Sequence, residues 1–268
     1  MLAESFGVDW LRISLPFDCE IHWCRPMRLE TNDNYKVLLI HTEPSQFSVS
    51  FDELAKINGF FDLIIAKDPK FLALDNVVLA PFGGCWVSKL PGKKEFSTSF
   101  ILSVGNHQGL SGYAERFGFI REIDKIHNKL VVYKSKRLAD VVEYPFPLLE
   151  NDSRNCLFDS MFHVSIENCC EVNYFTEKLI DCFATYTVPI YIGCPNVADY
   201  FNMDGMIIAA NHGELPAIIN RLSPQDYWGR IGAMRDNFVR SRKYIDFVAR
   251  VRNLIVKHGA PGRSPFGN

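Results

Sequence analysis

Short, continuous apolar runs separated by polar segments are the most regular feature of this sequence. Each run is long enough for one strand, and apolar residues follow one another instead of alternating with polar ones, which is typical of parallel strands covered on both faces. The runs lie at residues 10–15, 37–41, 62–66, 77–80, 100–104, 162–166, 188–192 and 206–209.

Helix-like segments alternate with these runs, and this order is typical of an α/β protein with parallel sheets. A polar stretch at residues 91–95, with Pro and Gly that break helices, interrupts the alternation. It predicts an N-terminal domain of residues 1–94 and a C-terminal domain of residues 95–268. The helical segments are expected at residues 51–58, around Arg116 and Arg121, at 177–185, and from 226 to 258, where apolar residues gather on one face.

Composition narrows the class of protein. The 268 residues are 47% hydrophobic and 22% charged, with a formal net charge of −2. Such a chain has enough apolar surface for a large core, and its charge balance makes nucleic acid an unexpected main partner. No apolar run approaches the ~20 residues of a membrane span. The N-terminus has no basic start followed by an apolar stretch, so a cytoplasmic protein is expected, with peripheral membrane association left open.

The eight cysteines are scattered through a chain that needs no disulfide staples, so we expect reduced, mostly buried thiols. Cys19, His22 and Cys24 have a spacing that supplies three metal ligands, but no second pair follows at a zinc-site interval. The alternative is a packed strand that includes Trp23, and we favour it. No metal or other cofactor is therefore expected.

The chemistry-bearing residues lie in the second half. The chain has no Walker loop, GxGxxG, HExxH or GxSxG, and no Asp-x-Asp pair to hold a divalent ion for a nucleotide sugar. The run at 100–104 leads through a glycine-containing turn at 105–109 into a helix. This order aims backbone N–H groups at a phosphate, although glycine turns end many strands.

A second strand end carries a stronger signal. Glu167 and Asn168 follow the run at 162–166, at the carboxyl edge where open α/β sheets bind ligands. Thr176 can cap the next helix, which places Glu177 and Lys178 in its first turn. A lysine there opposes the helix dipole unless an anion is near, and a diphosphate would be such an anion. The alternative is a solvated Glu-Lys pair on a surface helix.

The segment as a whole resembles the donor-site motif of the α-1,3-fucosyltransferases, glycosyltransferase family 10. The resemblance implies a GT-B type α/β fold with two Rossmann-like domains facing a cleft, the acceptor side first and the GDP-fucose side second. It also implies that Asn168, Tyr174, Glu177 and Lys178 contact GDP-fucose, with Lys178 on the diphosphate. The matching positions are Glu167, Asn168, Tyr174, Thr176, Glu177, Lys178, Pro189, Ile190, Tyr191, Gly193, Phe201 and Asn202.

Two further roles follow from the same resemblance. The family places an arginine against the donor phosphates, and Arg116 is the candidate because it follows the glycine turn, with Arg121 as the alternative. The family's general base corresponds to Glu43, which follows a strand directly and whose turn is fixed by Pro44, so its carboxylate is expected to face the interdomain cleft.

The sequence thus predicts an inverting, metal-independent enzyme that transfers fucose from GDP-fucose to a glycan hydroxyl. Its partners would be the nucleotide sugar and the glycan acceptor. Two alternatives stay open: the same fold acting on another nucleotide sugar, and a catalytically silent carbohydrate-binding or scaffold protein.

Overall fold

The computed structural model describes residues 4–6, 13–26, 29, 33–87, 92–105, 109–149 and 153–259. The chain forms two compact units that are each discontinuous in sequence. The first lies within Met1–Phe82, Val172–Tyr174 and Asp246–Asn268, and the second within Gly83–Glu171 and Phe175–Ile245. Within the described residues, each unit holds one five-stranded sheet in which every strand pairs parallel to its neighbours. The α/β class expected from the apolar runs is confirmed.

The first sheet has its strands in sequence order. Among the described residues they are β1 (Glu4–Phe6), β2 (Cys19–Trp23), β3 (Tyr35–Ile40), β4 (Leu63–Ala66) and β5 (Val77–Leu79). Helix α1 (Phe51–Ile57) follows β3 and begins with a capping box, in which the Ser50 side chain accepts from the Glu53 N–H and the Glu53 carboxylate accepts from the Ser50 N–H. The runs at 37–41, 62–66 and 77–80 are therefore confirmed as strands, and the segment at 51–58 as a helix.

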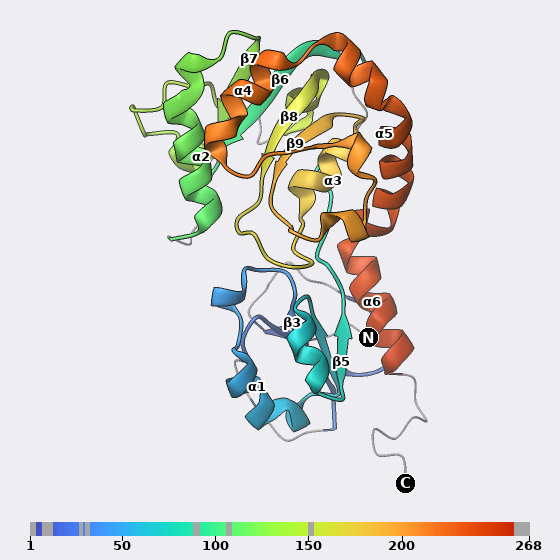
Figure 1. Ribbon diagram of the computed structural model, residues 1–268. Helices are drawn as coiled ribbons and strands as arrows, with labels where there is room; N and C mark the ends of the chain where they lie inside the picture. Colours follow the sequence, from blue (N-terminus) through green and yellow to red (C-terminus); the bar gives the residue numbers. More distant parts are fainter. Residues whose placement is uncertain are drawn as a thin grey trace. The chain divides into compact units, whose positions relative to one another are not determined.

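Both faces of this sheet are covered, which explains why its strands read as continuous apolar runs. Leu38 and Ile64 pack with Leu54 of α1 on one face. Val37 and Ile65 lie in a second cluster with Val251 of α6 (Phe247–His258). Helix α6, the last helix among the described residues, therefore belongs to the first unit (Figure 1). The predicted C-terminal domain of residues 95–268 included this helix, because an amphipathic pattern does not tell which sheet its apolar face covers.

Two further expectations concern the N-terminal part of the first unit. Residues 10–12 of the expected strand at 10–15 lie outside the described residues, and residues 13–15 contain no strand. Cys19, His22 and Cys24 are buried on and just after β2, as the packed-strand alternative proposed. Within the described part of the chain, no group of three or more His, Cys, Asp or Glu side chains is placed to hold a metal ion.

The second sheet has the order β10-β9-β8-β6-β7. Its strands are β6 (Glu95–Leu102), β7 (Leu130–Lys134), β8 (Ser160–Ile166), β9 (Val188–Ile192) and β10 (Ile207–Ile208). The chain moves from β6 to β7 on one side and then to β8 on the other side of β6. The strand order therefore reverses between β6 and β8, the place where open parallel sheets form a crevice at their carboxyl ends.

Helices pack around this sheet (Figure 1). They are α2 (Ser111–Glu122), α3 (Glu177–Ala184), α4 (Leu215–Arg221) and α5 (Pro224–Ile245). Helix α2 packs on β6 and β8, and α3 packs against α5 and β9. Gly112 allows α2 to approach the end of β8, since a Cβ there would lie 1.8 Å from the Glu167 carbonyl oxygen. The Gly112 N–H donates to the Asn168 carbonyl at 3.0 Å, so the start of α2 is fixed at the carboxyl end of β8.

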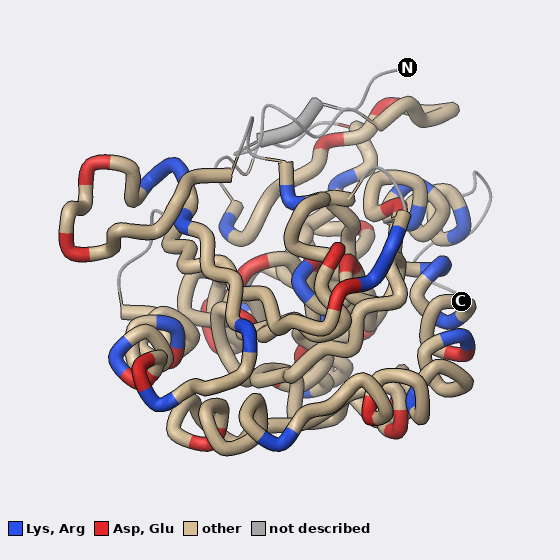
Figure 2. Tube along the Cα trace, turned by 90° about the horizontal axis from the view of Figure 1, so that it is seen from above, with Lys and Arg blue, Asp and Glu red and all other residues tan. Residues whose placement is uncertain are grey.

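Acidic and basic residues are interspersed along the described chain, as Figure 2 shows. None of the helices in the described ranges is long and apolar enough to cross a membrane. All eight cysteines are free thiols, including Cys169 and Cys170.

Candidate functional site

A pocket of about 730 Å³ opens in the second unit at the carboxyl ends of β6 and β8. Its wall contains Ser103 and Gly105 after β6, and Asn168 after β8. Most of the charged side chains around the pocket are positive. Its described lining has one carboxylate, that of Glu177. The basic side chains of the same lining are Arg116, Lys136, Arg137, Arg154 and Lys178. This excess of positive charge suits an anionic ligand.

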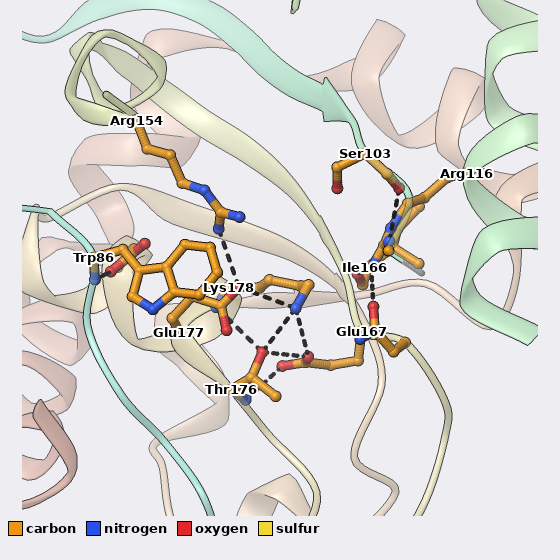
Figure 3. Close-up of polar contacts among 12 residues, drawn as sticks. Trp86, Ser103, Arg116, Arg154, Ile166, Glu167, Thr176, Glu177 and Lys178 are labelled. Atoms are coloured by element: carbon orange, nitrogen blue, oxygen red, sulfur yellow. Dashed lines mark hydrogen bonds and ion pairs between the residues drawn. The ribbon is translucent and has the colours of Figure 1, made fainter. Parts of the chain in front are cut away.

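Lys178 stands in the first turn of α3, where the free N–H groups of a helix start repel a cation. Its ammonium group has three partners (Figure 3). It donates to the Glu177 carboxylate and to the Thr176 hydroxyl, each at 3.1 Å, and lies 3.8 Å from the Glu167 carboxylate. The anions that offset the helix dipole at this lysine are therefore the protein's own side chains. A bound diphosphate would compete with them for the same ammonium group.

Glu167 connects the end of β8 to the start of α3. Its side chain is buried and accepts hydrogen bonds from the Thr176 N–H at 2.8 Å and from the Thr176 hydroxyl at 2.6 Å. Burial raises the pKa of this carboxyl above its usual range, although Lys178 and the two bonds from Thr176 oppose the rise. Glu167 does not line the pocket, and its contacts assign it a positioning role.

Glu177 is the carboxylate that faces the pocket. It lies between Lys178 and Arg154, whose Nη1 is 3.1 Å from its Oε1. Burial raises the pKa of this carboxyl, but the two cations outweigh burial and lower it to about 2. The group is therefore ionised at neutral pH and can accept hydrogen bonds from hydroxyl groups of a ligand.

Arg116 is buried beneath the pocket and is held by three acceptors. Its Nη1 donates to the Ser103 carbonyl at 2.9 Å, and its Nη2 donates to the Ile166 carbonyl at 2.6 Å and to the Asn168 Oδ1 at 2.9 Å. The bonds to Ser103 and Ile166 join the ends of β6 and β8 (Figure 3). The bond to Asn168 orients its amide. Arg121, the alternative arginine, is exposed on α2 and does not line the pocket.

The structure thus brings four of the six predicted site residues, Arg116, Asn168, Glu177 and Lys178, to one pocket. The other two belong to the first unit. The ring of Tyr174 is 1% exposed and lies against Lys67, whose ammonium is 5.1 Å from the ring centroid. Lys67 also donates to the backbone carbonyl of Glu43, which is half-buried after β3.

Trp86 and Arg154 are among the pocket residues that were not predicted from the sequence. Trp86 precedes the second sheet, and its indole carries the Arg154 guanidinium 4.1 Å from the ring centroid. Both lie in irregular segments without periodicity, so no pattern in the sequence indicates that they meet. A lone arginine in a polar loop gives no signal until the fold places it beside Glu177.

Comparisons with known proteins agree with this geometry. Residues 92–223, a span that begins and ends in the second unit, match the model of "Glycosyltransferase family 10 (fucosyltransferase) C-term". A comparison with curated protein sequences gave no match.

Solved structures show similarity of fold at low sequence identity. An α1,3-fucosyltransferase crystallised with GDP-fucose is 14% identical, with a TM-score of 0.56, over 94% of this chain and 80% of that one. TarM is 12% identical with a TM-score of 0.57, over 90% of this chain and 55% of that one. A UDP-forming trehalose-phosphate synthase from Burkholderia vietnamiensis is 13% identical with a TM-score of 0.58, over 91% of this chain and 72% of that one.

These neighbours are glycosyltransferases of the GT-B fold, which is therefore the fold of this chain. The family model matches the part of the chain that forms α3 and, apart from Trp86, the described lining of the cationic pocket. Residues 92–223 are thus similar to the C-terminal domain of glycosyltransferase family 10, and the chain is a glycosyltransferase.

Proposed function

We propose that this glycosyltransferase transfers fucose from GDP-fucose to a hydroxyl group of a glycan, with inversion at the anomeric carbon. The observation that carries the proposal is the cationic pocket at the ends of β6 and β8, which lies in the part of the chain that matches the fucosyltransferase family. The α1,3-fucosyltransferase with a similar fold was crystallised with GDP-fucose, which supports the same donor here.

In the proposed complex the diphosphate binds at Lys178, with Arg116 adding positive charge from beneath the pocket. Lys178 lies 15% exposed at the start of α3, so the ammonium group and the free N–H groups of the helix start can act on one anion. Glu177 accepts hydrogen bonds from ribose or sugar hydroxyls, and Asn168 is oriented toward the pocket by Arg116. Tyr174 is the remaining donor residue that the resemblance implies, although its ring is buried in the first unit.

The reaction needs one proton transfer and one leaving group. The acceptor oxygen attacks the anomeric carbon while the bond from that carbon to the diphosphate oxygen breaks, so GDP leaves with the bonding electrons. Glu43 is the proposed base that takes the proton of the acceptor hydroxyl. Cations of the pocket stabilise the charge that grows on the leaving diphosphate, a role that a divalent ion has in other transferases.

Calorimetric titration of the whole chain tests the donor. GDP and GDP-fucose are expected to bind with similar affinity, UDP more weakly, and GDP-mannose more weakly than GDP-fucose. Preference for UDP would move the assignment to the alternative, a GT-B transferase that uses another nucleotide sugar. A chain that binds glycans but no nucleotide at all would favour the catalytically silent alternative.

A further inference from the structure

An exposed tryptophan in the pocket wall has no part in the mechanism described above. The side chain of Trp86 is 61% exposed, although it lines the pocket formed around Arg154 and Glu177. An exposed indole in a pocket wall offers a ligand a large flat surface, and burying aromatic surface is one of the strongest apolar contributions to binding. The position of Trp86 in the pocket wall therefore suits its ring to contact a flat group of a ligand.

The indole is held in place although it is not packed in a core. The backbone N–H of Trp86 donates to the buried carboxyl group of Asp181 on α3 at 2.7 Å, which fixes the main chain that carries the indole. The Arg154 guanidinium lies 4.1 Å from the centroid of the ring. Figure 3 shows this arrangement, with the guanidinium over the ring and Glu177 beside it. A flat surface that is already ordered loses little entropy when a second flat group stacks on it.

The position of the indole relative to the other groups suggests which part of a ligand it meets. Arg154 contacts both the Trp86 ring and the Glu177 carboxylate, and Glu177 contacts Lys178. These contacts lead from the indole, through the guanidinium, to the carboxylate and then to the ammonium group. A nucleoside diphosphate has the same order of groups: a flat base, a ribose with hydroxyls to donate, and an anionic diphosphate.

We propose that Trp86 is the stacking surface for the nucleobase of the donor, with Arg154 as the positioning residue that fixes the indole. The assignment rests on the proposed function, since it names the base-binding part of the same donor site. Stacking of a base on an aromatic ring is tolerant of base identity. Trp86 therefore adds affinity for the nucleoside, and the choice of guanine belongs to other contacts.

The test compares GDP with inorganic pyrophosphate, which has the charged groups without the base. Trp86→Ala should weaken GDP binding by roughly 5- to 150-fold, the range that alanine substitution gives for one stacked base. Its affinity for pyrophosphate should stay that of the parent chain. Trp86→Phe keeps an aromatic ring and should retain most of the affinity for GDP.

Trp228 provides a matched control. It is 59% exposed on α5, contacts the Tyr227 ring edge-on at 5.1 Å and does not line the pocket. Trp228→Ala should leave both affinities unchanged. Equal GDP affinity in Trp86→Ala and the parent would overturn the stacking assignment alone, and so would an equal loss of GDP and pyrophosphate affinity. A parent chain that binds no GDP would overturn the proposed function, and the assignment with it.

Discussion

Neutralising Glu177 should remove a large, pH-dependent part of the stability of the second unit. Glu177→Gln keeps the shape of the side chain and removes the charge that Lys178 and Arg154 share at 3.1 Å. At neutral pH the variant leaves two cations beside each other at the start of α3 without their common partner. Removing one partner of a buried ion pair leaves the other charge buried and unpaired, which destabilises a protein far more than the loss of an exposed pair.

The pKa of Glu177 determines the size of this stability contribution and the direction in which it changes with pH. The folded state lowers this pKa from 4.5 to about 2. Each pH unit of difference corresponds to about 1.36 kcal/mol, so the ionised carboxylate contributes about 3 kcal/mol to folding. Because the pKa is depressed, this contribution is fully present above pH 4.5 and is lost as the pH falls from 4.5 to about 2.

Urea denaturation followed by circular dichroism measures the effect. Glu177→Gln should lower the free energy of unfolding by about 3 kcal/mol at pH 7, and the difference from the parent should shrink as the pH falls below 4.5. Glu95→Gln is the control: Glu95 also lies 3.0 Å from a lysine, Lys129, but it is 59% exposed, so little change is expected. A loss that is absent at pH 7, or equal at pH 7 and pH 3, would refute the reasoning.

Three other predictions concern the reaction and the cysteines. Glu43→Gln should reduce transfer roughly 10²- to 10⁴-fold with GDP-fucose affinity unchanged, because a base acts on the acceptor; transfer at the parent rate would remove Glu43 from the mechanism. Turnover should persist in excess EDTA, since side-chain cations neutralise the diphosphate; rescue by Mn²⁺ after loss in EDTA would contradict this. Mass spectrometry should find Cys169 and Cys170 as thiols, because a bond between sequence neighbours strains disulfide geometry; a native 169–170 disulfide would also contradict the expected cytoplasmic location.

The strands that carry the fold could be predicted where both of their faces are buried. The run at 188–192 is β9 residue for residue, and every residue of β9 is buried. Strand β7 at the edge of the second sheet was not predicted, since four of its five residues are only half-buried and its apolar run is short. The return of α6 to the first unit depends on packing between distant segments, which local periodicity does not contain.

The same limit applies to the site. Lys178 was identified because a lysine in the first turn of a helix is unfavourable beside the positive end of the helix dipole. This rule is local to the sequence, and it indicates a compensating anion nearby. The structure adds that Glu167 and Glu177 supply that compensation before any ligand binds. Arg154 breaks no local rule in its loop, and its importance comes only from the fold that brings it to Trp86 and Glu177.

The proposed donor site depends most directly on Lys178 as a diphosphate ligand. Lys178→Met keeps the apolar stem of the side chain and removes its charge, and Lys243→Met on α5 removes an exposed charge outside the pocket. Calorimetric titration with GDP should show an affinity loss of about 2 to 4 kcal/mol for Lys178→Met and none for Lys243→Met. Unchanged GDP affinity in a folded Lys178→Met chain would contradict the account.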